Sequence, residues 1–85
     1  MAETTPLEWT TFAGRVVEFL GVEPESVGRG TNIYNELGID SLGMFSLGMH
    51  VIKYFGIKLP LSEVATIVTL GDLYDALERN RLAEP

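Results

Sequence analysis

Apolar residues recur along this chain at the spacing of α-helices, and nowhere do they alternate with polar residues for long enough to form a sheet. The first periodic segment, 6–20, follows Thr5, begins with a proline and is followed by a glycine, which is the pattern of a capped helix. A second segment, 41–55, follows Asp40 and ends before Gly56. These signals predict an all-α fold.

Two further helices are expected in the last third of the chain. Ser62 is positioned to cap a short helix that runs through Ile67. Thr69 and Asp72 have the spacing of a capping box, and apolar residues at helical spacing follow them. Residues 82–85 are expected to form a frayed tail.

The segment 21–40 is rich in Gly, Pro and Asn and has no regular period, so it is predicted to be a long loop. Such a loop is unusual in so short a chain, and we expect it to be functional. The prediction is a four-helix bundle with a long first loop and a short third helix, forming one domain over 1–85 with an ordered core of about 6–82. Apolar residues spread along the loop are its expected anchors: Val22, Val27, Ile33, Leu37 and Ile39.

The composition excludes several kinds of function. The 85 residues include no cysteine and one histidine, so a disulfide framework, a thiolate nucleophile and a Cys/His metal site are not expected. Six basic and twelve acidic residues give a net charge of −6, which is the wrong sign for binding nucleic acid. Neither a signal peptide nor an apolar run of about 18 residues is present, so we expect a cytoplasmic protein without a membrane span.

No combination of side chains predicts an enzyme. His50 lies nine residues after Ser41, about 13 Å along a helix axis, and is too far away to serve as its base. Residues 28–31 (Gly-Arg-Gly-Thr) lack the lysine and spacing of a phosphate-binding loop and are expected to form a turn. Closely spaced carboxylates are expected to be solvated: Glu23 with Glu25, and Asp72 with Asp75.

The most distinctive motif is Gly38-Ile39-Asp40-Ser41-Leu42, at the start of the second predicted helix. Free N–H groups and the positive end of the helix dipole would stabilise a phosphate esterified to Ser41. Ordinary capping by Asp40 and Ser41 explains the same pattern equally well. The spacing alone leaves both interpretations open.

This motif resembles the attachment site of the acyl carrier proteins, whose serine receives 4′-phosphopantetheine from coenzyme A. The resemblance extends to the long first loop, to F-G-I-K-L-P at 55–60 and to T-L-G-D-L at 69–73. It implies a four-helix bundle of the acyl-carrier type without catalysis of its own, in which the thiol of an arm on Ser41 holds an acyl thioester. It also implies that Asp40 assists the metal of a phosphopantetheinyl transferase and that Leu42 contacts partner enzymes such as a ketosynthase or an acyltransferase.

Other carriers resemble the chain in part. Peptidyl carriers usually have two small residues before the serine, where this chain has Ile39 and Asp40, and this difference favours an acyl cargo. D-alanyl carriers share an Asp-Ser pair followed by an apolar residue and glycine, as at 40–43, so an aminoacyl or peptidyl cargo is the alternative. An alternative of another class is a helical adaptor that keeps the carrier fold and is never modified.

The predicted helix 41–55 departs from fatty-acid carriers, in which carboxylates on this helix meet basic patches on enzymes. It contains no Asp or Glu and one cation, Lys53. Seven acidic and two basic residues give 1–40 a net charge of −5, whereas five acidic and four basic residues give 41–85 a net charge of −1. We therefore expect recognition by apolar contact, and a role in polyketide or other specialised biosynthesis rather than in fatty acid biosynthesis.

The same helix carries two apolar stripes on roughly opposite sides. Met44, Leu47, Val51 and Phe55 form one stripe, of which Leu47, Val51 and Phe55 are expected to enter the core. The second stripe consists of Leu42, Phe45, Met49 and Ile52. It either docks partners, which we favour, or packs under the loop. We expect a free-standing monomer with weak apolar self-association. The residues expected to bind partners are Leu42, Met44, Phe45, Met49 and Ile52. The two methionines among them are expected at the rim of this surface.

Gly43 and Gly48 stand inside this helix, where each costs about 1 kcal/mol relative to alanine. A close approach by a partner or by the arm would explain both glycines. Space for a contact between helices explains Gly48 equally well.

Overall fold

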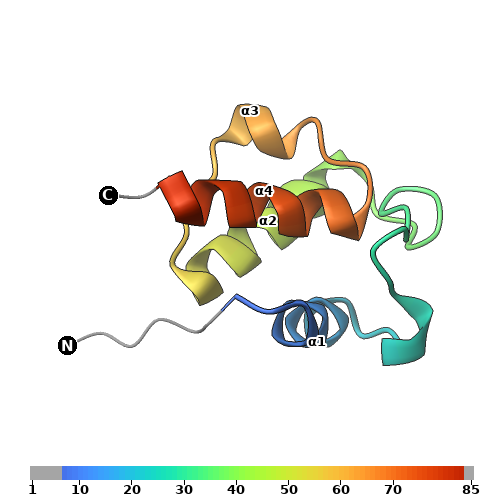
Figure 1. Ribbon diagram of the computed structural model, residues 1–85. Coiled ribbons are helices and arrows are strands. Elements are labelled where there is room, and N and C mark those ends of the chain that lie inside the picture. The colour runs from blue at the N-terminus through green and yellow to red at the C-terminus, as the bar shows by residue number, and fades with distance from the viewer. Residues whose placement is uncertain (1–6, 84–85) are drawn as a thin grey trace.

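The computed structural model describes residues 7–83, which form four α-helices and one short 3-10 helix (Figure 1). Within these residues the only β-type pairing is an isolated bridge between Asn32 and Thr69. Figure 1 shows α1 on one side of the central helices α2 and α4, and α3 on the other. The predicted all-α fold with a long first loop and a short third helix is confirmed. The elements are α1 (Trp9–Leu20), η1 (Pro24–Ser26), α2 (Ser41–Phe55), α3 (Leu61–Val64) and α4 (Leu70–Ala83).

The predicted start of the first helix at residue 6 is wrong. Helix α1 begins at Trp9, because Glu8 has an extended backbone and its carbonyl accepts the first helical hydrogen bond, from the Phe12 N–H, at 2.9 Å. Leu7 precedes this extended residue and is buried in the core. Thr5, the predicted cap, lies outside the described residues.

Helix α2 has the predicted bounds, and its ends show why. The Asp40 carboxylate caps the first turn by accepting a hydrogen bond from the Gly43 N–H. At the other end Gly56 has φ 68°, a left-handed conformation that favours glycine, and its N–H bonds to the Ile52 carbonyl. The two signals read from the sequence, an acidic cap and a terminal glycine, are therefore the ones that define the helix.

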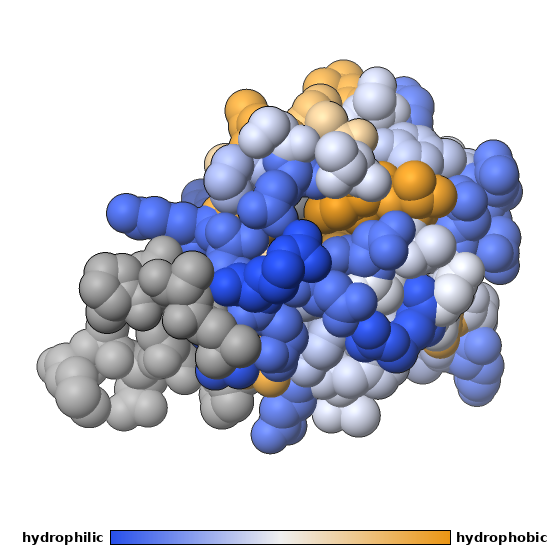
Figure 2. All heavy atoms as spheres, turned by 45° about the horizontal axis from the view of Figure 1, so that its top comes forward, coloured by the Kyte–Doolittle hydropathy of each residue, from blue (hydrophilic) through white to orange (hydrophobic). Residues whose placement is uncertain are grey.

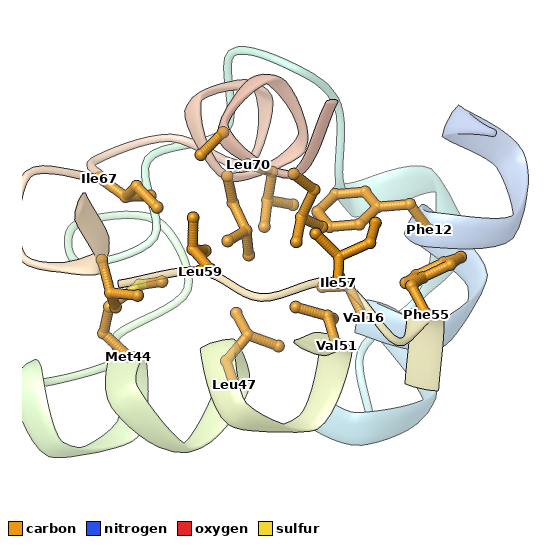
Figure 3. Packing of buried hydrophobic residues seen from close by; sticks show 14 of the residues in the cluster. Phe12, Val16, Met44, Leu47, Val51, Phe55, Ile57, Leu59, Ile67 and Leu70 are labelled. Carbon is orange, nitrogen blue, oxygen red and sulfur yellow. The ribbon is translucent and has the colours of Figure 1, made fainter. Parts of the chain in front are cut away.

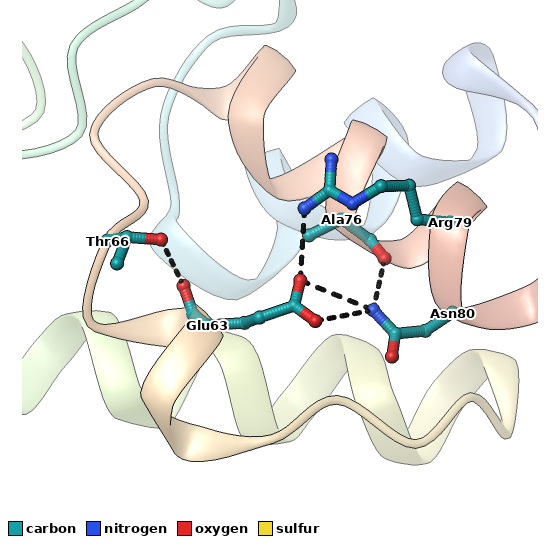
Figure 4. A network of polar contacts seen from close by, with 5 residues as sticks. All are labelled: Glu63, Thr66, Ala76, Arg79 and Asn80. Atoms are coloured by element: carbon teal, nitrogen blue, oxygen red, sulfur yellow. Dashed lines mark hydrogen bonds and ion pairs between the residues drawn. The ribbon is translucent and has the colours of Figure 1, made fainter.

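Helix α3 begins and ends earlier than predicted, because Pro60 and not Ser62 is the residue before its first turn. The Pro60 carbonyl accepts hydrogen bonds from the N–H groups of Glu63 and Val64, and Ser62 lies inside the helix. The helix ends at Val64, three residues before the predicted end. A polar network then ties this segment to α4 (Figure 4): the Glu63 carboxylate accepts hydrogen bonds from Arg79 at 3.0 Å and from Asn80 at 3.3 Å.

The start of α4 is a capping box, as predicted. The Thr69 hydroxyl accepts a hydrogen bond from the Asp72 N–H at 3.1 Å, and the Asp72 carboxylate accepts one from the Thr69 N–H at 3.0 Å. The backbone N–H groups of Thr69 and Val68 stabilise the charged carboxylate and lower the pKa of Asp72. The helix continues through Ala83, so the expected tail from residue 82 begins too early.

The core lies between α2 and α4 and is closed by α1 at one end (Figure 3). Leu47, Val51 and Phe55 are buried, as predicted for the first apolar stripe of α2. Most of the remaining core comes from α1, from α4 and from the connector between α2 and α3, and its main members are Phe12, Val16, Ile57, Leu59, Leu70, Leu73 and Leu77.

The first loop is held across the molecule by backbone hydrogen bonds to the segment that begins α4. The Ile33 N–H donates to the Val68 carbonyl at 2.8 Å, and the Leu70 N–H donates to the Thr31 carbonyl at 3.1 Å. Ile33 is fully buried, which confirms it as an anchor of the loop. The remaining predicted anchors are partly buried: Val22, Val27, Leu37 and Ile39.

Arg29 adds a side-chain link between the loop and α4. Residues 28–31 form the predicted turn, and Arg29 projects from it to pair with Asp75 at 2.7 Å. This hydrogen bond and the charge of Asp75 raise the pKa of Arg29. The guanidinium also lies 5.6 Å from the ring centroid of Trp9 and 5.5 Å from that of Tyr74.

The packing around Gly71 and Gly48 predicts opposite effects for substitution of these two glycines. A Cβ on Gly71 would lie 2.7 Å from the Arg29 carbonyl oxygen, so Gly71→Ala should lower the free energy of unfolding by roughly 1–3 kcal/mol. A Cβ on Gly48 would meet Val64 at 3.5 Å, an ordinary contact, so Gly48→Ala should be neutral or stabilising by up to about 1 kcal/mol. Urea unfolding of both variants measures the difference, and equal stabilities would contradict the packing.

Candidate functional site

The turn before α2 places each residue of the 38–42 motif by a specific interaction. Gly38 has φ 68°, which favours glycine. The Ile39 N–H then donates to the Ile33 carbonyl at 3.3 Å, which joins the turn to the anchored part of the loop. Asp40 accepts the Gly43 N–H at 2.8 Å, so Ser41 becomes the first helical residue.

Ser41 is exposed, and its side chain forms no hydrogen bond within residues 7–83. Its hydroxyl is therefore accessible to an enzyme that would modify it. A phosphodiester at this oxygen would carry its negative charge beside the N-terminus of a 15-residue helix, where the dipole favours an anion. Accessibility and electrostatics both fit a phosphopantetheine arm at this residue.

The chain's own packing accounts for Gly43 and Gly48. A Cβ on Gly43 would lie 2.6 Å from Cγ2 of Ile39 and 3.3 Å from the Asp40 carboxylate. Gly43 thus makes room for the turn that presents Ser41, without a partner or the arm being needed. Gly48 is buried where α2 meets Val64 of α3, which supports the helix-contact explanation for that glycine.

The second stripe of α2 is only partly exposed. Leu42 exposes 74% and Met49 49% of its surface, whereas Phe45 and Ile52 are partly buried against the core. The prediction that Met44 lies at the rim is wrong, because Met44 is 1% exposed. It falls on the helix side that faces the core and fills space there.

Two further exposed apolar residues lie between the end of the connector and the start of α4, and neither was predicted from the sequence. Leu61 is the first residue of α3, and Val68 lies just before α4. Neither belongs to a helical stripe long enough to reveal its exposure, so no signal in the sequence marked them. Figure 2 shows apolar patches among polar surface on the side of the molecule that carries α3.

The side chains excluded as catalytic groups have structural roles or face solvent. The His50 ring stacks on Phe19 at a centroid distance of 4.6 Å, and its Nε2 lies 3.4 Å from a guanidinium nitrogen of Arg15. It therefore joins α1 to α2, as a structural histidine. The carboxylates expected to be solvated are all exposed: Glu23, Glu25, Asp72 and Asp75.

No group of three or more His, Cys, Asp or Glu side chains within residues 7–83 is arranged to hold a metal ion. No helix in this part of the chain is long and apolar enough to cross a membrane.

Comparison with known proteins gives the same picture. The family model described as the phosphopantetheine attachment site matches residues 11–77. Similar proteins include an acyl carrier protein of Rhodopseudomonas palustris strain BisB18, 45% identical over 65 residues, which are 76% of this chain and 82% of the relative. Acyl carrier proteins of Bradyrhizobium sp. strain ORS 278 and Afipia carboxidovorans are each 43% identical, with the same coverage.

The geometry of the turn makes Asp40 the cap on which the position of Ser41 depends. Asp40→Ala removes the acceptor of the Gly43 N–H and should lower the free energy of unfolding by about 1 kcal/mol. Asp40→Asn keeps an oxygen acceptor and should stay close to the parent protein. Thermal unfolding followed by circular dichroism measures both, and equal losses in the two variants would contradict the capping role.

Proposed function

The chain belongs to the acyl carrier protein family, and on that premise we propose that Ser41 bears its 4′-phosphopantetheine arm. Proteins of this family carry acyl groups and do not catalyse reactions, so the chain is a carrier that serves enzymes. The observation that supports Ser41 most directly is its exposed hydroxyl at the first position of a capped helix, inside the 38–42 motif. The 82% coverage of the relatives supports one carrier domain.

The arm supplies a thiol that holds an acyl group as a thioester. The chain itself has no thiol to offer, because it contains no cysteine. The residues of the chain hold and present the arm. Ser41 provides the oxygen that forms the phosphodiester, and Asp40 keeps that oxygen at the helix terminus. One Asp40 oxygen accepts the Gly43 N–H, and we assign the other to the metal of the phosphopantetheinyl transferase during loading.

Partner enzymes, such as a ketosynthase or an acyltransferase, are proposed to bind the second stripe of α2. Leu42 and Met49 are its exposed members, and Phe45 and Ile52 support them from partly buried positions. Helix α2 has no carboxylate that could meet a basic patch, so apolar contact would supply most of the affinity. This departure from fatty-acid carriers supports a role in polyketide or other specialised biosynthesis. We propose in addition that the carrier acts as a monomer.

Loading at Ser41 is tested by intact-protein mass spectrometry. Incubation with coenzyme A, magnesium and a broad-specificity phosphopantetheinyl transferase should add one arm to the parent protein and none to Ser41→Ala. Ser46→Ala, which changes an exposed serine of the same helix, is the matched control and should load normally. No mass increase in folded parent protein would instead support an unmodified adaptor.

Asp40→Asn separates capping from loading. Because this variant keeps an acceptor for the helix cap, its stability should stay close to that of the parent. The loss of one negative charge should still slow the transferase reaction, if Asp40 assists the metal. An unchanged loading rate at equal stability would show that Asp40 caps the helix but does not assist the metal of the transferase.

Recognition through α2 predicts weak dependence on salt. Leu42→Asp should lower the affinity of the holo-protein for a partner enzyme by about tenfold or more. The fold should stay intact, because an acidic residue is favourable in the first turn of a helix. Thr10→Asp places the same charge at an exposed position of α1, outside α2, and should have little effect. Affinities measured by calorimetry at low and high salt should differ little for the parent protein, and a steep loss on adding salt would contradict apolar recognition.

A further inference from the structure

A groove of about 260 Å³ lies between α1 and the start of the first loop, and no residue of α2 lines it. Its exposed lining is mainly apolar. The α1 side is formed by Trp9, Ala13 and Val17, which follow one another at intervals of four residues, and the loop side by Pro24 and Val27.

Two residues that line the groove, Gly14 and Trp9, show free space and a packed ring. A Cβ on Gly14, which also lines the groove, would meet no atom within 4 Å, so the helix surface there is free for contact. Trp9 is held in place by Phe12 and Tyr74, whose ring centroids lie 5.4 and 5.6 Å from its own. A volume below the usual range of about 300–1,000 Å³ for small-molecule sites suits one or two bulky side chains of another protein.

Charge on this side of the molecule favours one kind of occupant. Glu8 precedes Trp9 and Glu23 and Glu25 flank Pro24; all three are exposed, and none forms an ion pair within residues 7–83. The two cations near this side are already paired: Arg15 with Glu18, and Arg29, which lies 5.6 Å from the Trp9 ring centroid, with Asp75. Uncompensated carboxylates beside an apolar groove are complementary to an apolar segment with basic flanks.

We propose that this groove is a second docking surface, which binds an amphipathic helix of a partner protein whose bulky apolar side chains enter between α1 and η1. Lysine or arginine residues of that helix face Glu23 and Glu25. This surface differs from the α2 stripe in its physics, because charge attraction steers the partner to it while apolar contact holds the partner there. Its use does not require an arm on Ser41.

The single tryptophan of the chain, Trp9, lines the groove and reports its occupancy directly. The probe is a helical peptide with leucine on one face and lysine on the other, without aromatic residues, titrated into the unmodified full chain. Saturable binding should shift the Trp9 emission to shorter wavelength as the ring loses water. The same peptide with glutamate in place of lysine is the matched control and should bind much more weakly.

Three variants locate the binding. Ala13→Gln fills the groove from α1, and Val27→Gln fills it from the loop. Each should lower the affinity for the peptide by about tenfold or more, while the circular dichroism spectrum stays unchanged. Glu25→Lys should weaken it several-fold at low salt and less at high salt. Glu36→Lys makes the same charge change farther along the loop, where no residue lines the groove, and should bind like the parent.

Other results would overturn the proposal. An unchanged Trp9 emission at saturating peptide would show that the groove stays empty. Equal affinities for the parent, Ala13→Gln and Val27→Gln would place the peptide elsewhere. Equal weakening by Glu25→Lys and Glu36→Lys would reduce the attraction to net charge alone. Because every measurement is made on the unmodified chain, the outcome is independent of whether Ser41 accepts an arm.

Discussion

The position of Ser41 depends on backbone hydrogen bonds that tie a long loop to a helix far away in the sequence. The bonds from Ile33 to Val68, from Leu70 to Thr31 and from Gly71 to Arg29 fix the middle of the loop on the start of α4. Ile39 then bonds back to Ile33, and Asp40 closes the first turn of α2. Without these bonds, twenty residues of loop would leave the start of α2 held only by its apolar side. The loop therefore has a clear structural task.

The helices were predictable because their signals are local. Asp40 and Gly56 define the ends of α2 through bonds within four residues, and the same holds for the capping box at Thr69. What could not be predicted depends on contacts between distant residues. Leu7 is buried in the core, and α1 begins only at Trp9. The contact between Arg29 and Gly71 joins two segments, and the sequence of neither segment alone predicts it. Within the site, the motif indicated Ser41, but only packing separates buried Met44 from exposed Met49.

The charge of the chain is distributed so that its two candidate surfaces differ in kind. Helix α2 presents Leu42 and Met49 with no carboxylate among its fifteen residues, whereas the outer side of α1 and η1 presents Glu23 and Glu25 beside an apolar groove. Desolvating the first surface costs little electrostatic energy, and binding there is expected to be insensitive to ions. Binding at the second surface is expected to respond to ionic strength. The dependence of affinity on salt concentration therefore distinguishes a partner of one surface from a partner of the other.

The capped first turn of α2 has a consequence for transport. A flexible tether attached to a fixed point keeps its free end inside a small volume, and the effective concentration of that end at a neighbouring catalytic centre depends on the length of the tether. Attachment within a fluctuating loop would add the motion of the loop to that of the tether and would dilute the cargo. With the arm on Ser41, as proposed, the hydrogen bond from the Gly43 N–H to Asp40 holds its origin at the first turn of a helix. Delivery of the cargo then depends on the arm and on how the partner binds.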